Sequence, residues 1–307
     1  MLDLTLLSEE QIFGDNKLVI FEKYGTKCAI TDFAILLGGS VSSDYHTDDG
    51  SKKDRTGWWW TKTKYKTKYE DYVRAVSRSG DISWGDADAR IGGVRPALPY
   101  SSISTNIVRG SSGIKEILYG EYPQWVIDES YSREVERAYN SENIKTTGKS
   151  YTTDSVDFQD YDKSFKPRSH IEYEYNGEKF IRFVGDLNCN GKVLSDGRII
   201  KSRNVYWVRV EPIIWLVDER ANIAFSKHIL ASGLQFNNTN YYGYFENTDI
   251  KRFMDNYLSK EIIANANTLN TGVNIKTNST DNIDDIFTEA INRMNEINSA
   301  PKTKILK

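Results

Sequence analysis

Two short motifs are the most informative part of the sequence: GVRPAL at residues 93–98 and, further along the chain, YGEYPQ at residues 119–124. Residues 101–113, between the motifs, are rich in Ser and Gly and are typical of a connector. A run of tryptophans, residues 58–60, precedes both motifs, and the aromatic content of the chain favours strands. Side chains alternate along a strand, so the outer two indoles are expected on one face and the middle one on the other.

The composition is that of a folded protein without a strong overall field. The chain has 307 residues, of which 39% are hydrophobic and 27% are charged, and its formal net charge is −3. This length allows one large domain or two ordinary ones, and this charge argues against nucleic acid or an anionic membrane as a partner. The first residues lack a basic segment followed by a long apolar run, so we expect no secretory signal, and no stretch approaches the length of a membrane span.

Short strands separated by turns predict a meandering antiparallel sheet in the first third of the chain. They are expected at residues 57–61, 72–76, 80–84 and 91–98. Further on, Asp196-Gly197 is the strongest hairpin signal, with short strands expected on either side of it. The longest strand is predicted over residues 204–217, where Pro212 requires an edge position or a bulge because it lacks a backbone N–H.

Helical signals occur near both ends and in the middle of the chain. Ser8 is a cap for a first short helix, and a polar insertion over residues 128–172 is expected to contain a helix at residues 132–139. Residues 248–258 carry apolar side chains at helical spacing behind a cap at Asn247 or Thr248. An Asn- and Thr-rich linker is expected over residues 264–282, followed by an amphipathic helix over residues 283–298. The apolar stripe of this last helix, which we expect to dock on a partner, contains Ile283, Ile286, Phe287, Ile291 and Met294.

The motifs together resemble a bacterial and phage domain family of unassigned activity that is related to the C-type-lectin-like fold. In that family the YGxYPQ motif opens the domain, and a tryptophan pair and GVRPAL close it, which is the reverse of the order in this chain. The resemblance covers residues 28–105 and 115–262 and implies an α+β, circularly permuted lectin-like domain over residues 1–263. It therefore predicts that residues 57–98 and 203–258 share one hydrophobic core.

The resemblance also implies roles for individual residues. It places the Arg95 guanidinium in the core, where its five donors can tie several backbone carbonyls together. It assigns Trp58, Trp60 and Trp215 to the core as well. The sequence WWWTKT departs from the WWLRSP that is usual in the family, so a different binding surface is expected there.

A sugar-binding surface is one interpretation of the other aromatic residues. The face of an indole packs on the apolar face of a pyranose, and its N–H can donate a hydrogen bond. The candidates are Trp59, Trp84, Tyr65 and Tyr69, with Trp59 preferred because it points away from its two neighbours. Core packing is the alternative for a tryptophan cluster on a strand. The lysines of residues 62–68 are interpreted as a solvated loop rather than a nucleic-acid patch, because acidic residues follow them directly.

No cofactor is expected, with calcium left as an open alternative. Residues 186–191 (DLNCNG) match the first half of a calcium-binding loop, in which oxygen ligands at alternate positions converge on one cation. The second half departs from the pattern, because Gly197 occupies the position of the final Glu. The candidate ligands are Asp186, Asn188, Asn190 and Asp196. The alternative is a hairpin turn that uses Asn and Gly for backbone reasons.

The resemblance implies a non-enzymatic structural or binding protein, and most closely a bacteriophage virion component. Such a protein is made in the host cytoplasm and serves as a capsid decoration or a tail-associated protein, with other virion proteins, a second copy or a host-surface glycan as partner. The alternatives are an oxidoreductase similar to the formylglycine-generating enzyme, which relies on cysteines, and a cytosolic interaction module that uses the C-terminal helix. We expect no catalytic constellation, so alanine should alter stability at most when it replaces His46, His170, His228, Cys28 or Cys189.

Overall fold

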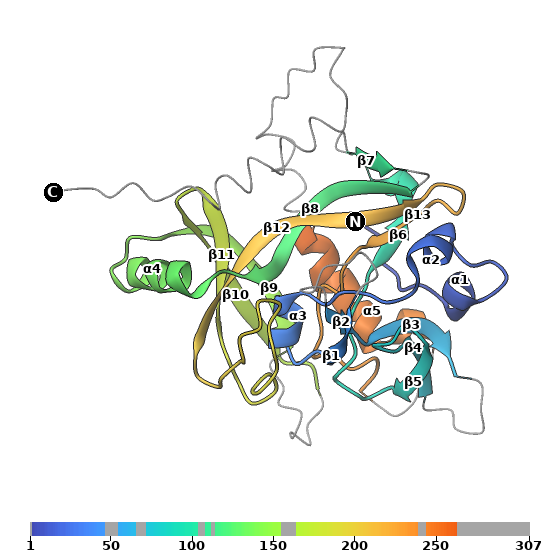
Figure 1. Cartoon of the computed structure of the whole chain (residues 1–307), viewed down its shortest axis with the longest axis horizontal. Coiled ribbons are helices and arrows are strands. Elements are labelled where there is room, and N and C mark those ends of the chain that lie inside the picture. Colours follow the sequence, from blue (N-terminus) through green and yellow to red (C-terminus); the bar gives the residue numbers. More distant parts are fainter. Residues whose placement is uncertain are drawn as a thin grey trace, which may run out of the picture.

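The computed structural model describes residues 2–46, 55–65, 72–103, 108–111, 114–154, 164–238 and 244–262. These residues form a mixed α+β fold in which antiparallel sheets dominate and the helices are few and mostly short (Figure 1). The α+β class predicted from the sequence is therefore confirmed. The expected linker and C-terminal helix, residues 264–298, lie outside the described residues.

An eight-stranded antiparallel sheet runs through the centre of the molecule. Its main path, in spatial order, is β6 (Ala97–Pro99), β13 (Ile223–Ser226), β12 (Val205–Asp218), β11 (Glu178–Val184), β10 (Pro167–Tyr175) and β9 (Lys145–Asp154). Strand β8 (Ile114–Val126) pairs with β12 and also carries β7 (Val108–Ser111). The long strand β12 thus has β8 along one edge, and β11 followed by β13 along the other.

Pro212 lies in the middle of β12, and the ladder adapts to it. The register between β12 and β8 shifts on both sides of the proline, between Arg209 and Val210 and between Pro212 and Ile214. The side chain of Gln124 bridges this irregularity, because its Nε2 donates to the carbonyls of Glu211 and Pro212, both at 3.0 Å. The sequence predicts an edge position or a bulge at this proline, and the two register shifts are the irregularity that the ladder has there.

Two smaller sheets flank the main one. Strands β3 (Trp59–Lys64), β4 (Tyr72–Val76) and β5 (Ile82–Asp86) form an antiparallel meander, and β1 (Val41–His46) pairs with β2 (Arg55–Gly57). The strand expected over residues 91–98 is mostly single bridges that end in β6. The hairpin expected around Asp196-Gly197 is a turn with one bridge, between Val193 and Ile199, next to which the Leu194 N–H donates to the Arg198 carbonyl at 2.9 Å.

Five α-helices are present among the described residues, at Glu9–Phe13 (α1), Val19–Tyr24 (α2), Asp32–Leu36 (α3), Glu129–Asn140 (α4) and Asp249–Phe253 (α5). Ser8 and Gln11 form the capping box that the sequence indicates for α1. Thr248 caps α5, and the helix continues through a π-helical turn, Met254–Leu258, to residue 262. Asp128 caps α4, which is longer than the helix expected at residues 132–139.

The polar segment over residues 128–172 is a structural part of the main sheet rather than an added loop. It supplies β9 and most of β10, whose buried positions hold polar or half-polar side chains such as Thr153, His170 and Glu172. Glu172 accepts hydrogen bonds from the hydroxyls of Tyr151 (2.5 Å) and Thr147 (2.7 Å). Because these groups satisfy one another, a segment of polar composition can line a core.

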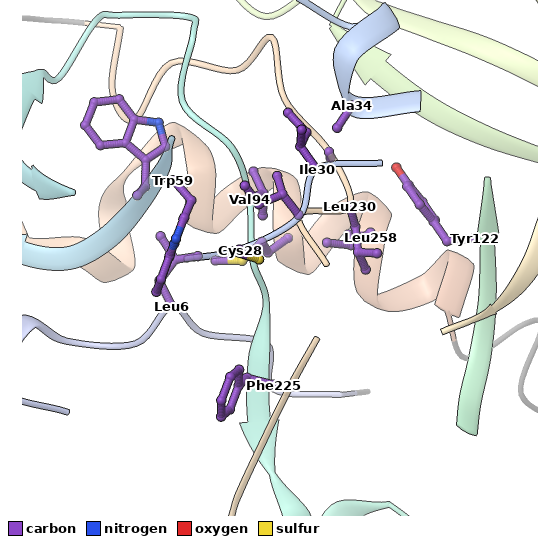
Figure 2. Packing of buried hydrophobic residues seen from close by; sticks show 14 of the residues in the cluster. Leu6, Cys28, Ile30, Ala34, Trp59, Val94, Tyr122, Phe225, Leu230 and Leu258 are labelled. Carbon is purple, nitrogen blue, oxygen red and sulfur yellow. The ribbon is translucent and has the colours of Figure 1, made fainter. Parts of the chain in front are cut away.

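One continuous hydrophobic core joins the two motif-bearing parts of the chain (Figure 2). It contains Trp60 and Val94 from residues 57–98, and Trp215 and Met254 from residues 203–258. The two parts also share the main sheet, because Ala97 of β6 pairs with Phe225 of β13. The prediction of one shared core is therefore confirmed. Trp58 is only partly buried and packs at the edge of this core, with its ring 4.4 Å from that of Trp60.

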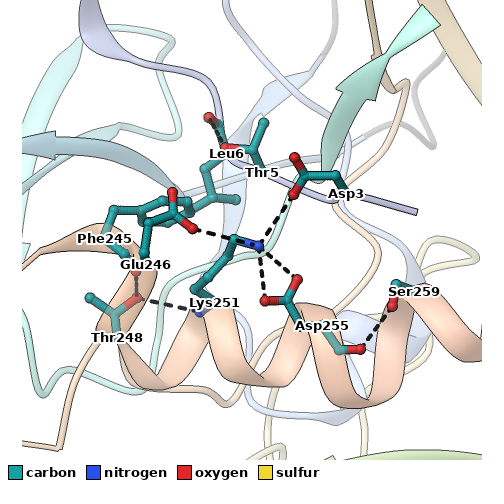
Figure 3. A network of polar contacts seen from close by, with 9 residues as sticks. All are labelled: Asp3, Thr5, Leu6, Phe245, Glu246, Thr248, Lys251, Asp255 and Ser259. Atoms are coloured by element: carbon teal, nitrogen blue, oxygen red, sulfur yellow. Dashed lines mark hydrogen bonds and ion pairs between the residues drawn. The ribbon is translucent and has the colours of Figure 1, made fainter. Parts of the chain in front are cut away.

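Charged side chains tie remote segments to this core. Lys251 of α5 is buried, and its Nζ reaches Asp255 at 2.7 Å, Asp3 at 3.4 Å and Glu246 at 3.7 Å (Figure 3). The ammonium thereby fixes the N-terminal segment, in which Leu4 is fully buried, against the last described helix. Arg90 and Asp154 form a second buried ion pair, at 2.5 Å, with side chains only 5% and 3% exposed.

Replacing Arg90 by Leu should lower the free energy of unfolding by about 3–5 kcal/mol, because it removes the guanidinium that balances a buried carboxylate. Urea unfolding followed by circular dichroism measures this loss. Arg133→Ala, which breaks the exposed pair with Glu129, is the control and should change stability by less than about 1 kcal/mol. An effect of Arg90→Leu no larger than that of the control would contradict the prediction.

Candidate functional site

The outer side of the three-stranded sheet carries a group of exposed aromatic side chains. In β5 the exposed positions are Ile82, Trp84 and Asp86, and they alternate with positions that face inward. Gly85 shows the inward direction, because a Cβ on it would lie 2.9 Å from the Trp58 indole. Trp84 is 48% exposed, although it is among the largest apolar side chains in the chain. This surface, with Tyr65, Tyr72, Arg74 and Trp84, is called the aromatic face below.

The rings of the aromatic face are ordered by one another. Tyr65 lies parallel to Trp84, with 2° between the ring planes and 5.9 Å between the centroids. Tyr72 meets Trp84 edge-on at 4.5 Å. A backbone hydrogen bond of 3.1 Å from the Tyr65 N–H to the Tyr72 carbonyl holds the first ring next to the sheet. Because each ring is supported by a neighbour, the exposed indole is held in one orientation.

A cation completes this surface. Arg74 is directly opposite Trp84 in the register of β4 and β5. Its guanidinium carbon lies 4.0 Å from the centroid of the Tyr65 ring, in cation–π geometry. Its Nε pairs with Glu9 Oε2 at 3.0 Å, and Glu9 is in turn held by a hydrogen bond from its backbone N–H to Thr63. The aromatic face therefore combines an apolar platform with a positioned positive charge.

The structure brings together two of the four predicted ligand-binding residues, Trp84 and Tyr65. Tyr69 lies outside the described residues. The expectation for Trp59 is wrong, because this side chain is 0% exposed. Both faces of the first part of β3 are covered by other parts of the protein. The side chain of Trp59 therefore points away from those of Trp58 and Trp60 but is still buried. Sequence reasoning missed Tyr72 and Arg74, although their spacing in a predicted strand places them on one face.

Arg95 is buried, as the resemblance implies, but its surroundings are aromatic rather than a set of carbonyls. Its Nε donates to the Ser226 carbonyl at 2.9 Å. The guanidinium carbon lies 4.7 Å from the Phe225 ring centroid and 4.9 Å from that of Trp59. Burial lowers the pKa of the guanidinium. Trp60 and Trp215 lie in the core as expected, and the indole of Trp215 donates to the Tyr119 carbonyl at 2.9 Å.

The candidate calcium ligands serve turns in the structure. Asp186 Oδ1 accepts from the Asn188 N–H at 2.9 Å, and Asn190 Oδ1 accepts from the Ser202 N–H at 2.9 Å. Asp196 accepts from both the N–H and the Nε of Arg198. In the described ranges no group of three or more His, Cys, Asp and Glu side chains is arranged to hold a metal ion. These contacts agree with the turn interpretation of the Asn-rich sequence.

The cysteines and histidines are dispersed over structural positions. Cys28 and Cys189 are free and buried. Burial raises the pKa of the Cys28 thiol, and it raises that of Cys189 to about 11. His228 packs edge-on against Trp125 at 5.4 Å, and His46 ends β1. His170 is buried between the rings of Phe33 and Phe183, and its Nε2 pairs with the Thr153 hydroxyl at 2.8 Å.

Comparison with models of protein families, with curated proteins and with solved structures found no match for this chain. A search of the described helices for one of membrane-spanning length and apolarity found none.

Replacing His170 by Gln should make the free energy of unfolding depend less steeply on pH at acidic pH. Burial lowers the pKa of His170 from 6.5 to about 3 in the folded protein. Between these values the unfolded chain binds a proton that the folded protein does not. The stability contributed by the neutral imidazole is therefore complete above pH 6.5 and is lost as the pH falls, by up to about 1.4 kcal/mol per pH unit.

Urea unfolding of both proteins at a series of pH values between neutral and mildly acidic measures the difference in slope. Carboxylates titrate in both proteins, so the quantity to compare is the slope of one protein minus that of the other. Equal slopes would show that the imidazole is protonated in the folded state, in contradiction to its burial.

Proposed function

We propose that this protein is a non-enzymatic binding module of a bacteriophage virion, with a circularly permuted lectin-like fold, and that its aromatic face binds a glycan. In this proposal it is a capsid decoration or a tail-associated protein that contributes to host attachment. Its further partners are other virion proteins or a second copy of itself.

The exposed indole of Trp84 carries the proposal. Trp59, Trp60, Trp207 and Trp215 are 0% exposed, so the fold buries large indoles where it can. Trp84 instead lies on the outer side of the three-stranded sheet, in contact with the rings of Tyr65 and Tyr72, and leaves apolar surface in water at a cost. A flat, held ring next to polar groups is the kind of surface on which the apolar face of a pyranose stacks.

The shared core supports the permuted fold. The YGEYPQ motif lies on β8 and the GVRPAL motif leads into β6, and both contribute fully buried residues, Tyr122 and Val94 among them. Val94 also bridges to Ala231, from the other half of the chain. In the proposal, residues 28–105 and 115–262 are the two halves of one domain joined in reverse order.

The setting of the two cysteines weighs against the alternative of an oxidoreductase. A reactive or metal-binding cysteine needs its thiolate, and burial with a raised pKa favours the protonated thiol at both Cys28 and Cys189. The predicted C-terminal helix remains part of the proposal as a docking element for a partner.

Replacing Trp84 by Ala should weaken glycan binding about tenfold or more, because about 1.5 kcal/mol of stacking is lost. A microarray of bacterial surface glycans identifies ligands of the unchanged protein, and titration calorimetry then compares the variants. Tyr244→Ala removes another aromatic side chain, 81% exposed and outside the aromatic face, and should leave binding unchanged. Equal affinity of the unchanged protein and Trp84→Ala would refute the assignment of the site.

Deleting residues 266–307 should leave the body folded, because the described core is already closed by buried residues up to Ile262. The unfolding temperature should change by no more than a few degrees, while self-association or attachment to particles should weaken. Calorimetry and light scattering measure the two effects, and Phe287→Asp in the full chain tests the docking stripe without a deletion. An unfolded truncated chain would assign the helix to the core, and unchanged assembly would exclude the docking role.

A further inference from the structure

We propose that the aromatic face selects acidic glycans, in which a sugar ring carries a carboxylate, and that Arg74 is the residue that recognises this group. The inference rests on the proposed function, since it requires that a glycan binds at this surface. It goes further because it names the chemical class of the sugar and the contact that distinguishes it from a neutral one.

The position of Arg74 places a cation at the edge of the stacking platform. Arg74 and Trp84 are cross-strand partners, so their side chains project from neighbouring points on the same side of the sheet. A sugar ring that covers the indole would therefore have its substituents next to the guanidinium. The Arg74 side chain is 24% exposed, which leaves it accessible from solvent.

The Arg74 guanidinium is also held in place before a ligand binds. Glu9 engages Nε, and the Tyr65 ring supports the flat face of the group at 4.0 Å. An arginine bound through Nε keeps two terminal nitrogens, Nη1 and Nη2, whose parallel N–H donors have the spacing of a carboxylate. Because the side chain is ordered before the ligand arrives, less conformational entropy is lost on binding.

The charges on the surface also give the ligand an orientation. Asp86 follows Trp84 on the same side of β5, because it lies two residues further along the strand. It is exposed and is opposite Tyr72 in the register of β4 and β5. Its carboxylate repels an acidic group but accepts hydrogen bonds from hydroxyls. The sugar carboxylate is thus expected at the Arg74 end of the platform, and the ring hydroxyls at the Asp86 end.

A nucleic acid fits these charges less well, although bases also stack on aromatic rings. Its phosphates repeat along the strand and call for a run of cations. On the aromatic face Arg74 is paired with the Glu9 carboxylate, Asp86 places a second carboxylate opposite Tyr72, and the chain as a whole has a net charge of −3. One carboxylate per sugar ring matches a single positioned guanidinium better.

The test compares acidic polysaccharides with their own carboxyl-reduced forms, so that only the charge differs. The probes are polygalacturonate, alginate and polysialic acid, each measured by titration calorimetry with the full chain. We expect at least one acidic polymer to bind about tenfold more tightly than its reduced form, the size of one charge-assisted hydrogen-bonding contact. Arg74→Gln should abolish this preference and leave the weaker, charge-independent stacking, whereas Trp84→Ala should weaken the binding of both forms by about tenfold or more.

Two controls separate recognition from effects on the fold. Arg133→Gln removes an exposed arginine of α4 and should keep the preference, and unfolding midpoints should show that Arg74→Gln is folded. Arg74→Lys keeps the positive charge but loses the two parallel donors of the guanidinium. This variant should retain part of the preference for the acidic polymer.

The possible results distinguish the inference from the proposed function. Equal binding of acidic and reduced polymers, with no effect of Arg74→Gln, would overturn the acidic selectivity and leave glycan binding in place. Tighter binding of a thymidine oligonucleotide than of any polysaccharide would overturn both. Binding of no polysaccharide, including those of the glycan array, would likewise overturn both.

Discussion

The fourteen-residue strand β12 forms ladders on both of its edges, and most other elements are positioned by them. It holds β8, and with it the YGEYPQ motif, along one side. On the other side it holds β11 and the strands beyond it, and then β13, which brings β6 and the GVRPAL motif into the same sheet. Around the proline, between the β11 ladder that ends at Arg209 and the β13 ladder that begins at Trp215, only the β8 edge is paired, so backbone groups there need other partners. The side chain of Gln124 supplies one for the carbonyls of Glu211 and Pro212.

The smaller sheet that bears the aromatic face depends on this frame through its inner side. Trp59 and Trp60 of β3 are fully buried, and Trp59 bridges to Gly93, next to the buried Arg95. Gly93 is required there, because a Cβ would lie 2.4 Å from the Ile229 side chain. The outer side of the same sheet is free to carry exposed residues because the inner side contributes so much apolar burial. Buried charges such as Arg90 and Lys251 specify how segments meet, since a displaced charge in the core is costly.

The sequence predicts best where a signal is local. The capping box at Ser8, the cap at Thr248 and the bulge at Pro212 each follow from the chemistry of one residue and its immediate neighbours, and all are present. Composition predicts a polar insertion where β9 and β10 lie, because the buried positions of these strands hold polar groups that hydrogen-bond to one another. That arrangement cannot be distinguished from a solvated loop by composition alone.

The candidate site shows the same difference between features that depend on local sequence and features that depend on contacts between distant residues. Trp84 and Tyr65 could be selected as aromatic residues near a predicted sheet, but the partnership of Trp84 with Arg74 depends on the register between two strands. The prediction that Trp59 is exposed is wrong for a related reason. The alternation of side chains along a strand shows which side a residue faces, but not whether that side is covered by other residues.

The two cysteines have a practical consequence for work in solution. Both are buried, and burial raises the pKa of each thiol, so neither should react readily with maleimides under native conditions. A single cysteine introduced at an exposed site such as Tyr244 would then be the one reactive handle on the folded protein. A fluorophore attached there would report on encounters with cells or particles without removal of the native thiols.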